Sequence, residues 1–301
     1  MAPKTNLKQL RLPTEQVNPH TCGLDKMTPL QIARAINRED FTAARAVQKA
    51  APQIAAAMIA AAQTYASGHK IIFIGAGTSG RLGILEAVEC VPTFNTKPSQ
   101  IIALIAGGKN AVFRSKEGAE DDAAQGAKEI SKVAKKDDFV IGLTASGRTP
   151  YVMGALKRAQ QLGTKTALVS CNPSADITNA SLHICLETGA EALSGSTRMK
   201  AGTATKMALN AITTGAMTLC GKTYGNLMID VRPTNEKLVL RALRLICTIS
   251  GTDEKTAGKL LTAAGNNVKT AVVMFHKKTD RKTAEKLLKK ERGFLTRVID
   301  D

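Results

Sequence analysis

The stretch IIFIGAGTSGRLG, residues 71–83, decides the fold of this chain. Its four leading apolar residues are typical of a strand buried on both faces, and the glycine-rich turn after them leads into a helical stretch. Four more such runs follow, at Ile101–Ile105, Phe139–Leu143, Thr166–Ser170 and Leu182–Leu186. Crossover helices fit after the first three runs. This alternation predicts an α/β fold with a five-stranded, parallel, doubly wound sheet and helical N-terminal and C-terminal extensions.

The segments on either side of the sheet are expected to be helical. Thr28 is a candidate N-cap with Pro29 at the first helical position, which predicts a short helix from Pro29 to about Ile36. A second helical region covers about residues 41–66, where Pro52 breaks it, kinks it or opens a new helix. The domains expected are an N-terminal arm with helices over 1–50, the sheet domain over 51–222, a connecting helical segment over 223–250 and a small helical domain over 251–301.

The 301 residues include 42 Lys and Arg against 25 Asp and Glu, a net charge of +17. This excess favours anionic partners such as nucleic acid, a membrane surface or a phosphorylated metabolite. Residues 252–301 hold only 12 Lys and Arg against 7 Asp and Glu, so the charge is not gathered in one block. No basic motif is interleaved with aromatic residues, and we therefore do not expect a nucleic-acid partner.

The sequence shows no signal peptide, membrane span or cysteine pairing, and these features bear on where the protein is located. The N-terminal stretch has no apolar signal-peptide core, and the Ala-rich stretch 50–68 is interrupted by Pro52, Gln53 and Gln63, which predicts a buried helix and no membrane span. The six cysteines are scattered, with no C-x-x-C pair and no metal-ligand spacing to the four histidines. These features predict a cytoplasmic protein without a metal site.

Residues 75–80 read G-x-G-x-x-G between a strand and a helix. A dinucleotide site also needs an acidic residue at the end of the second strand, but residues 105–109 read Ile-Ala-Gly-Gly-Lys. A P-loop motif is absent as well. What remains suits a monophosphate held by hydroxyls and free N–H groups at a helix N-terminus. The alternative is a tight turn without a ligand.

Two further segments repeat this chemistry. Residues 140–148 align with residues 73–81 at a constant offset of 67 and share Ile-Gly and Ser-Gly-Arg, and residues 194–197 read Ser-Gly-Ser-Thr before another predicted helix. The three segments could converge on one anion, although each Ser could instead be a simple N-cap. The predicted binding residues are Thr78, Ser79, Gly80, Arg81, Ser146, Gly147, Arg148, Thr149, Ser194 and Ser196.

Carboxylates are the best acid–base candidates, because the four histidines lie in contexts typical of structural or solvated residues. Glu86 and Glu89 lie on the helix after the first glycine loop. A second acidic group follows the second predicted strand, at Glu117, Glu120, Asp121 and Asp122. From their spacing in the sequence alone, most of these carboxylates would be interpreted as surface charges.

Several longer motifs occur in order along the chain: GAGTSGRLG (75–83), ECVPT (89–93), EGAEDD (117–122), ASGRTPYV (145–152), SGSTRMKAGTA (194–204) and GNLMID (225–230). With them the chain resembles the N-acetylmuramic acid 6-phosphate etherases, a branch of the sugar isomerase (SIS) domain family. It departs from that pattern at Val91-Pro92, where the family usually has two prolines. The resemblance implies a SIS-type sheet, no cofactor and no metal, and a homodimer with sites near the subunit interface.

The resemblance also implies a reaction and its residues. The substrate would be a phosphorylated amino sugar, N-acetylmuramic acid 6-phosphate, cleaved to N-acetylglucosamine 6-phosphate and D-lactate by elimination followed by hydration. Glu89 of ECVPT and Glu120 of EGAEDD match the acid–base residues of the family. Two alternatives stay open: a non-catalytic sugar-phosphate regulator, similar to the glucokinase regulatory protein, and a sugar-phosphate isomerase.

Overall fold

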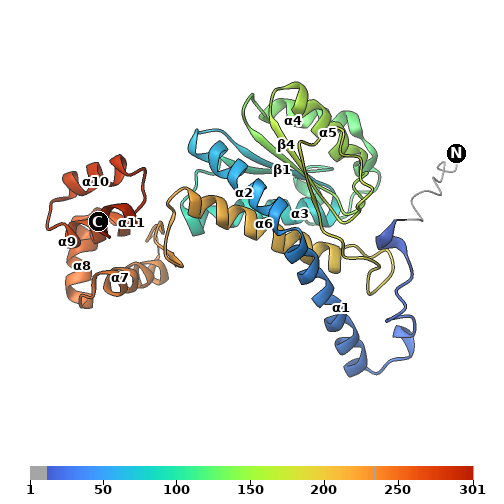
Figure 1. Cartoon of the computed structure of the whole chain (residues 1–301), viewed down its shortest axis with the longest axis horizontal. Helices are drawn as coiled ribbons and strands as arrows, with labels where there is room; N and C mark the ends of the chain where they lie inside the picture. Colours follow the sequence, from blue (N-terminus) through green and yellow to red (C-terminus); the bar gives the residue numbers. More distant parts are fainter. Residues whose placement is uncertain (1–11, 234, 301) are drawn as a thin grey trace. The chain divides into compact units, whose positions relative to one another are not determined.

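The structure is a computed structural model that describes residues 12–233 and 235–300. Its contacts divide the chain into two compact units (Figure 1). One holds the described residues up to Ala87 together with Ser99–Thr213, and the other holds Val88–Pro98 together with the described residues from Thr214 onward. The predicted domain boundaries at residues 50, 222 and 250 stay predictions.

The first unit contains the predicted sheet. Its strands are all parallel and stand in the order β2-β1-β3-β4-β5, with a register that sets Ile71 of β1 beside Ile101 of β2 and Phe139 of β3. The five predicted strands are confirmed to within about one residue at either end. Their bounds are β1 Ile71–Gly75, β2 Ile101–Ile105, β3 Phe139–Leu143, β4 Lys165–Ser170 and β5 Leu182–Cys185.

Helices cover the sheet on both faces, as a doubly wound sheet requires (Figure 1). On one face Ile72, Val140 and Leu168 of the strands pack with Ile130 of α4 and Leu156 of α5 in one buried cluster. The helices with residues in this unit are α1 Pro29–Lys49, α2 Ala51–Ala66, α3 Gly77–Phe94, α4 Ala123–Val133, α5 Pro150–Gln161 and α6 Lys200–Leu219. The division between the two units falls within α3 and α6.

The first helix corrects one prediction. Thr28 does cap it and Pro29 does open it, but α1 continues without a break to Lys49, beyond the predicted end near Ile36. Glu39 is buried on the same face of α1 as Ala35 and Ala43, which lie four residues before and after it. A charged residue on that face hides the helical period from a hydrophobicity pattern. Pro52 lies in the first turn of α2, so it opens a new helix.

The second unit is helical except for a short antiparallel hairpin of β6 Thr223–Tyr224 and β7 Leu227–Met228. Its core joins the residues around Ile229 to apolar side chains of the helices, such as Ile246, Leu261 and Val272. The helices are α7 Glu236–Ser250, α8 Glu254–Ala263, α9 Val268–His276, α10 Arg281–Lys290 and α11 Thr296–Ile299. Across the described parts of both units, the helices all fall short of the length and apolarity that a membrane span needs.

Candidate functional site

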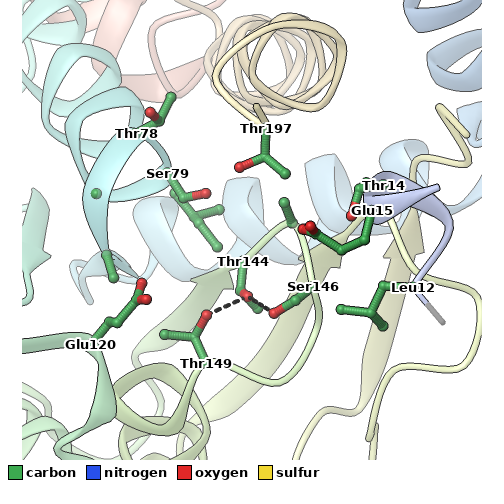
Figure 2. A pocket seen from close by; sticks show the side chains of 14 residues that line it. Leu12, Thr14, Glu15, Thr78, Ser79, Glu120, Thr144, Ser146, Thr149 and Thr197 are labelled. Atoms are coloured by element: carbon green, nitrogen blue, oxygen red, sulfur yellow. Dashed lines mark hydrogen bonds between the residues drawn. The ribbon is translucent and has the colours of Figure 1, made fainter. Parts of the chain in front are cut away.

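A cavity of about 410 Å³ opens at the carboxyl edge of the sheet in the first unit (Figure 2). Ligands of open α/β sheets bind at this edge, because the loops after the parallel strands meet there. Hydroxyl side chains from three separate segments line the cavity. Its lining is Leu12, Thr14, Glu15, Ala76, Gly77, Thr78, Ser79, Glu120, Leu143, Thr144, Ala145, Ser146, Thr149 and Thr197.

The loop between β3 and α5 contributes a cluster of three hydroxyls (Figure 2). Thr144 Oγ1 lies 2.7 Å from Thr149 Oγ1 and 3.2 Å from Ser146 Oγ. Thr149 immediately precedes α5, and its side chain makes no cap hydrogen bond, so its hydroxyl faces the cluster. Hydroxyls at a helix N-terminus can donate to an anion, and the helix dipole favours negative charge there.

The backbone of this loop is fixed from outside the cavity. Asn172 Nδ2 donates to the carbonyl oxygen of Ser146 at 2.9 Å. Gly147 has φ +68°, and a Cβ there would lie 2.3 Å from the Cβ of Ala175. Only glycine combines that conformation with that close approach. Gly147 therefore shapes the loop without lining the cavity, and Arg148 is exposed beside it.

The first glycine loop divides into binding and packing positions. Thr78 and Ser79 line the cavity at the start of α3. Gly80 does not line it: a Cβ there would lie 2.6 Å from Ile105 Cγ1, so this glycine lets α3 pack closely on the end of β2. Arg81 is turned to other partners, because its Nε and Nη2 donate to the carbonyl oxygens of Val112 and Ala111, each at 2.8 Å.

The third segment enters the site differently from the prediction. Thr197 lines the cavity, whereas Ser194 and Ser196 do not. The expectation of free N–H groups at this helix start is wrong, because the buried Glu191 carboxylate accepts from Lys200 N at 2.8 Å and from Ala201 N at 2.9 Å. The first turn of α6 already holds an internal anion. Its contribution to ligand binding is therefore the hydroxyl of Thr197.

Glu120 is the predicted acid–base residue that lines the cavity. It sits on the short turn Ala119–Asp121 and also lines a neighbouring cavity of about 270 Å³ with Arg81 and Lys116. Partial burial raises the pKa of the Glu120 carboxyl, and the negative charges of Asp121 and Glu117 raise it further. A carboxylate with a raised pKa is a stronger base than an ordinary one, which suits proton abstraction.

The two carboxylates on α3 are placed differently. Glu86 is buried, where it accepts hydrogen bonds from Asn210 and Thr213 of α6, so its role is to join the two helices. Glu89 is exposed on α3 and belongs to the second unit. It is not a lining residue of the cavity. Its predicted acid–base role stays a prediction.

Leu12, Thr14 and Glu15 line the cavity although the sequence reading did not single them out. They lie in an irregular arm with no periodicity, so no local pattern could have placed them. Thr197 could have been found, because it is the last hydroxyl before α6. The described lining contains two carboxylates and no Lys or Arg, so an anion here depends on hydroxyls, N–H groups and helix dipoles.

Comparisons with known proteins find a matching family model and similar solved structures. A family model described as the glucokinase regulatory protein N-terminal SIS domain matches residues 53–160. Among solved structures, the chain is similar to a phosphoheptose isomerase from Francisella tularensis, with a TM-score of 0.49 and 16% identity over 64% of this chain and all of that one. By the family-model match, residues 53–160 belong to the sugar isomerase (SIS) domain class.

Curated relatives match nearly the full chain. N-acetylmuramic acid 6-phosphate etherase from Serratia proteamaculans is 46% identical over 96% of this chain and 98% of its own length. The etherases of Rhodopirellula baltica and Lactobacillus johnsonii are 45% and 46% identical, covering 97% and 98% of this chain and 98% and 99% of their own lengths. The chain belongs to the N-acetylmuramic acid 6-phosphate etherase family.

Proposed function

We propose that this protein cleaves the lactyl ether of N-acetylmuramic acid 6-phosphate, a carbon–oxygen lyase reaction. The relatives that carry this name are 43–46% identical over at least 95% of each chain. The observation that carries the proposal within the structure is Glu120, a carboxyl with a raised pKa beside a cluster of hydroxyls at the carboxyl edge of the sheet. A sugar monophosphate supplies both the anion and the acidic C–H bond that such a site can use.

The hydroxyl cluster is the proposed phosphate site. Ser79, Thr144, Ser146 and Thr149 offer donors from two loops that each open a helix, α3 and α5. Hydroxyls and backbone N–H groups at helix N-termini bind phosphate without a cation. With the phosphate there, the sugar occupies the rest of the cavity, which Glu120 also lines.

Glu120 is the proposed base. In the open-chain sugar the C1 aldehyde acidifies the proton on C2, and an ionised carboxylate removes it. The electron pair left on C2 forms a C2–C3 double bond as the C3–O bond to lactate breaks, and a proton is delivered to the departing lactate oxygen. Water then adds its hydroxyl to C3 and a proton returns to C2. The products are N-acetylglucosamine 6-phosphate and D-lactate, with one water consumed.

Glu89 is the proposed acid at the ether oxygen, as its place in ECVPT implies. It lies about three turns beyond Thr78 on α3, and it is not among the residues that line the cavity of its own chain. We propose that the protein is a homodimer in which a second copy brings this carboxylate to the site. Exposed apolar side chains on four helices support an interface: Phe41, Ile59, Leu85 and Met207.

A lactate assay tests the proposed function. The purified chain is incubated with N-acetylmuramic acid 6-phosphate, and D-lactate is measured enzymatically. We expect lactate release, with a large loss for Glu120→Gln and Glu89→Gln. If the wild-type chain releases no lactate, the proposed etherase function is wrong. Binding of sugar phosphate without turnover would favour a regulator. Interconversion of an aldose and a ketose phosphate would instead indicate an isomerase.

The location proposed for this enzyme is the cytoplasm. No disulfide joins the six cysteines, all of which lie in the described residues, and burial raises the pKa of the Cys171 thiol to about 12, which disfavours its reactive thiolate form. Free thiols are typical of a reducing compartment. Cell fractionation with an antibody to the chain tests this location.

A further inference from the structure

The N-terminal arm supplies a carboxylate to the cavity that the proposed mechanism does not use. Glu15 ends the short helical turn Pro13–Glu15, and its side chain lines the cavity with Ser146 and Thr197 (Figure 2). Glu15 and Glu120 lie on opposite sides of the hydroxyl cluster in this view. Within the described residues, the Glu15 carboxylate has no hydrogen-bond or ion-pair partner.

The arm is held firmly against the segment before α6. Gly195 N donates to the carbonyl oxygen of Thr14 at 3.2 Å, and Thr21 Oγ1 donates to the carbonyl oxygen of Ala192 at 2.9 Å. Gly195 has φ +75°, and a Cβ there would lie 2.9 Å from Glu15 Oε2. The arm therefore packs on bare backbone at this point, which places Glu15 at the edge of the cavity.

A polar network beneath the arm anchors it further. Asn18 Nδ2 donates to Glu39 Oε2 at 2.7 Å and to the carbonyl oxygen of Ala190 at 3.2 Å, and His20 Nδ1 lies 3.0 Å from Glu39 Oε1. Glu39 in turn pairs with Lys200, the first residue of α6. Buried networks of this kind hold one geometry, because each broken bond would leave a buried group unsatisfied.

Thr14 gives a second, independent indication of ligand binding at this end of the cavity. It lines the cavity, it is 1% exposed, and its Oγ1 has no hydrogen-bond partner within the described part of the chain. Buried hydroxyls are normally satisfied, and an orphan one beside a cavity indicates a partner that binds there. The two adjacent residues of the arm thus present one acceptor and one unsatisfied hydroxyl.

The negative charge of Glu15 limits which group of a ligand can bind beside it. Two unit charges of the same sign about 4 Å apart repel by about 4 kcal/mol in a partly solvated site, so Glu15 cannot face the phosphate or the lactyl carboxylate. A carboxylate accepts only, and its partner must be an N–H or O–H donor. An uncharged sugar offers both kinds, as hydroxyls and as the acetamido N–H.

We propose that Glu15 is a substrate-binding residue of this pocket, whose carboxylate accepts a hydrogen bond from an uncharged hydroxyl or amide N–H of the amino sugar while Thr14 contacts the same end of the ligand. This inference rests on the proposed function for the identity of the sugar. It assigns the arm the task of recognising the sugar, while the hydroxyl cluster recognises the phosphate. The arm thereby selects a sugar phosphate over inorganic phosphate.

Calorimetric titration of the full chain with two probes tests this assignment. For Glu15→Ala we expect N-acetylglucosamine 6-phosphate to bind about tenfold to a hundredfold more weakly, the range typical of a lost hydrogen bond to a charged group. Inorganic phosphate should bind as it does to the wild type, or more tightly, because a nearby negative charge is gone. Glu15→Gln keeps an acceptor oxygen and should recover part of the sugar-phosphate affinity.

Glucose 6-phosphate then separates the two donor types. If the acetamido N–H is the donor, glucose 6-phosphate should lose little affinity on Glu15→Ala. If a hydroxyl is the donor, glucose 6-phosphate and N-acetylglucosamine 6-phosphate should lose affinity alike. Asp25→Asn is the matched control, because it removes an exposed carboxylate from the same arm outside the cavity. In turnover assays KM should rise for Glu15→Ala while kcat is retained, as for a contact kept in ground and transition states.

Two results would overturn the assignment. One is unchanged affinity of Glu15→Ala for N-acetylglucosamine 6-phosphate, and the other is an equal loss for both probes, which would indicate a collapsed arm. The proposed function fails separately, through a wild-type chain that releases no lactate. In that case the binding comparison still decides whether Glu15 contacts the sugar, and a chain that binds neither probe removes both proposals.

Discussion

Glu39 of α1 and Lys200 of α6 form a buried ion pair, with Oε2 and Nζ 2.5 Å apart and side chains that are 5% and 3% exposed. Burial by itself would raise the pKa of Glu39, but hydrogen bonds from Lys200, His20 and Asn18 outweigh it and lower the pKa to about 2. The carboxylate is thus ionised at neutral pH, and both of its oxygens have partners. The pair connects the first helix, the arm and the start of α6 at one point beneath the site.

Lys200→Met should destabilise the protein strongly. It leaves the Glu39 carboxylate buried without its cation, which costs about 3–5 kcal/mol in comparable buried pairs. Chemical denaturation followed by circular dichroism measures the loss in the free energy of unfolding. Adding Glu39→Gln to Lys200→Met should restore part of it, because the uncompensated charge is then removed.

The exposed pair of Lys49 and Glu187 provides the control. Its Nζ–Oε2 distance is 3.0 Å, but the side chains are 70% and 45% exposed. Solvated pairs contribute about 0–1 kcal/mol, so Lys49→Met should change the unfolding midpoint little. Equal losses for the two Lys→Met variants would contradict the structural role assigned to the buried pair.

The sequence predicts the sheet well because its strands are buried on both faces. Runs such as Phe139–Leu143 are fully buried, so burial alone dictates their composition and the pattern can be read directly. The glycine loops were found for a similar local reason, since a strand, a tight turn and a helix start are adjacent in sequence. Thr78, Ser79, Ser146 and Thr149 accordingly line the cavity.

The remaining features depend on contacts between distant segments. Glu191 occupies the N–H groups of Lys200 and Ala201, and the arm reaches Ala190 and Ala192 across more than 170 residues. No local pattern marks such pairings. They are why the first turn of α6 offers the Thr197 hydroxyl and not free N–H groups. The full length of α1 cannot be read from the apolar pattern, because Glu39 lies on its buried face.

Gly147→Ala should weaken phosphate binding. The new Cβ would meet Ala175 Cβ at 2.3 Å, so the loop that holds Ser146 and Thr149 must shift. Calorimetry with inorganic phosphate measures the effect, and we expect an affinity loss together with a drop in lactate release. Displaced hydroxyls bind an anion less well, because oriented binding is sensitive to displacements of about 1 Å.

Gly189→Ala separates the clash from backbone strain. Gly189 has φ +67°, almost the value at Gly147, but a Cβ there would meet nothing within 4 Å. Both variants carry the cost of an alanine in the left-handed region, about 1 kcal/mol. Phosphate affinity should survive in Gly189→Ala. Similar losses in both variants would show that destabilisation, and not displacement of the loop, is responsible.

Asp121→Asn should move the acid limb of the pH profile of kcat/KM to lower pH. Burial and then the Asp121 charge raise the pKa of Glu120, so removing that charge lets the carboxylate ionise at lower pH. Since the proposed base works in its ionised form, activity should persist further into the acid range. Glu117→Gln should act in the same direction, and Asp25→Asn, which does not contribute to this shift, should leave the limb in place. A limb unmoved in Asp121→Asn would exclude ionised Glu120 as the base.

Mixing two inactive variants should restore activity if the site is shared between two copies. Glu120 lines the cavity, whereas Glu89 is exposed on α3 and does not line the cavity of its own chain. In a mixed dimer of Glu89→Gln and Glu120→Gln, one site then combines both substitutions and the other has both native carboxylates. Random exchange makes half of the dimers mixed, so about a quarter of the wild-type lactate release should return.

The design of the mixing experiment keeps the two arrangements distinguishable. The variants are unfolded together and refolded, and each is refolded alone as the baseline. The matched control mixes the single variant Glu120→Gln with a double variant that carries both Glu15→Ala and Glu120→Gln. Every site in this mixture lacks the Glu120 carboxylate, whichever chains pair. It should stay inactive. If the Glu89→Gln and Glu120→Gln mixture also stays inactive while co-purification of differently tagged chains shows mixed dimers, Glu89 does not act across the subunit interface.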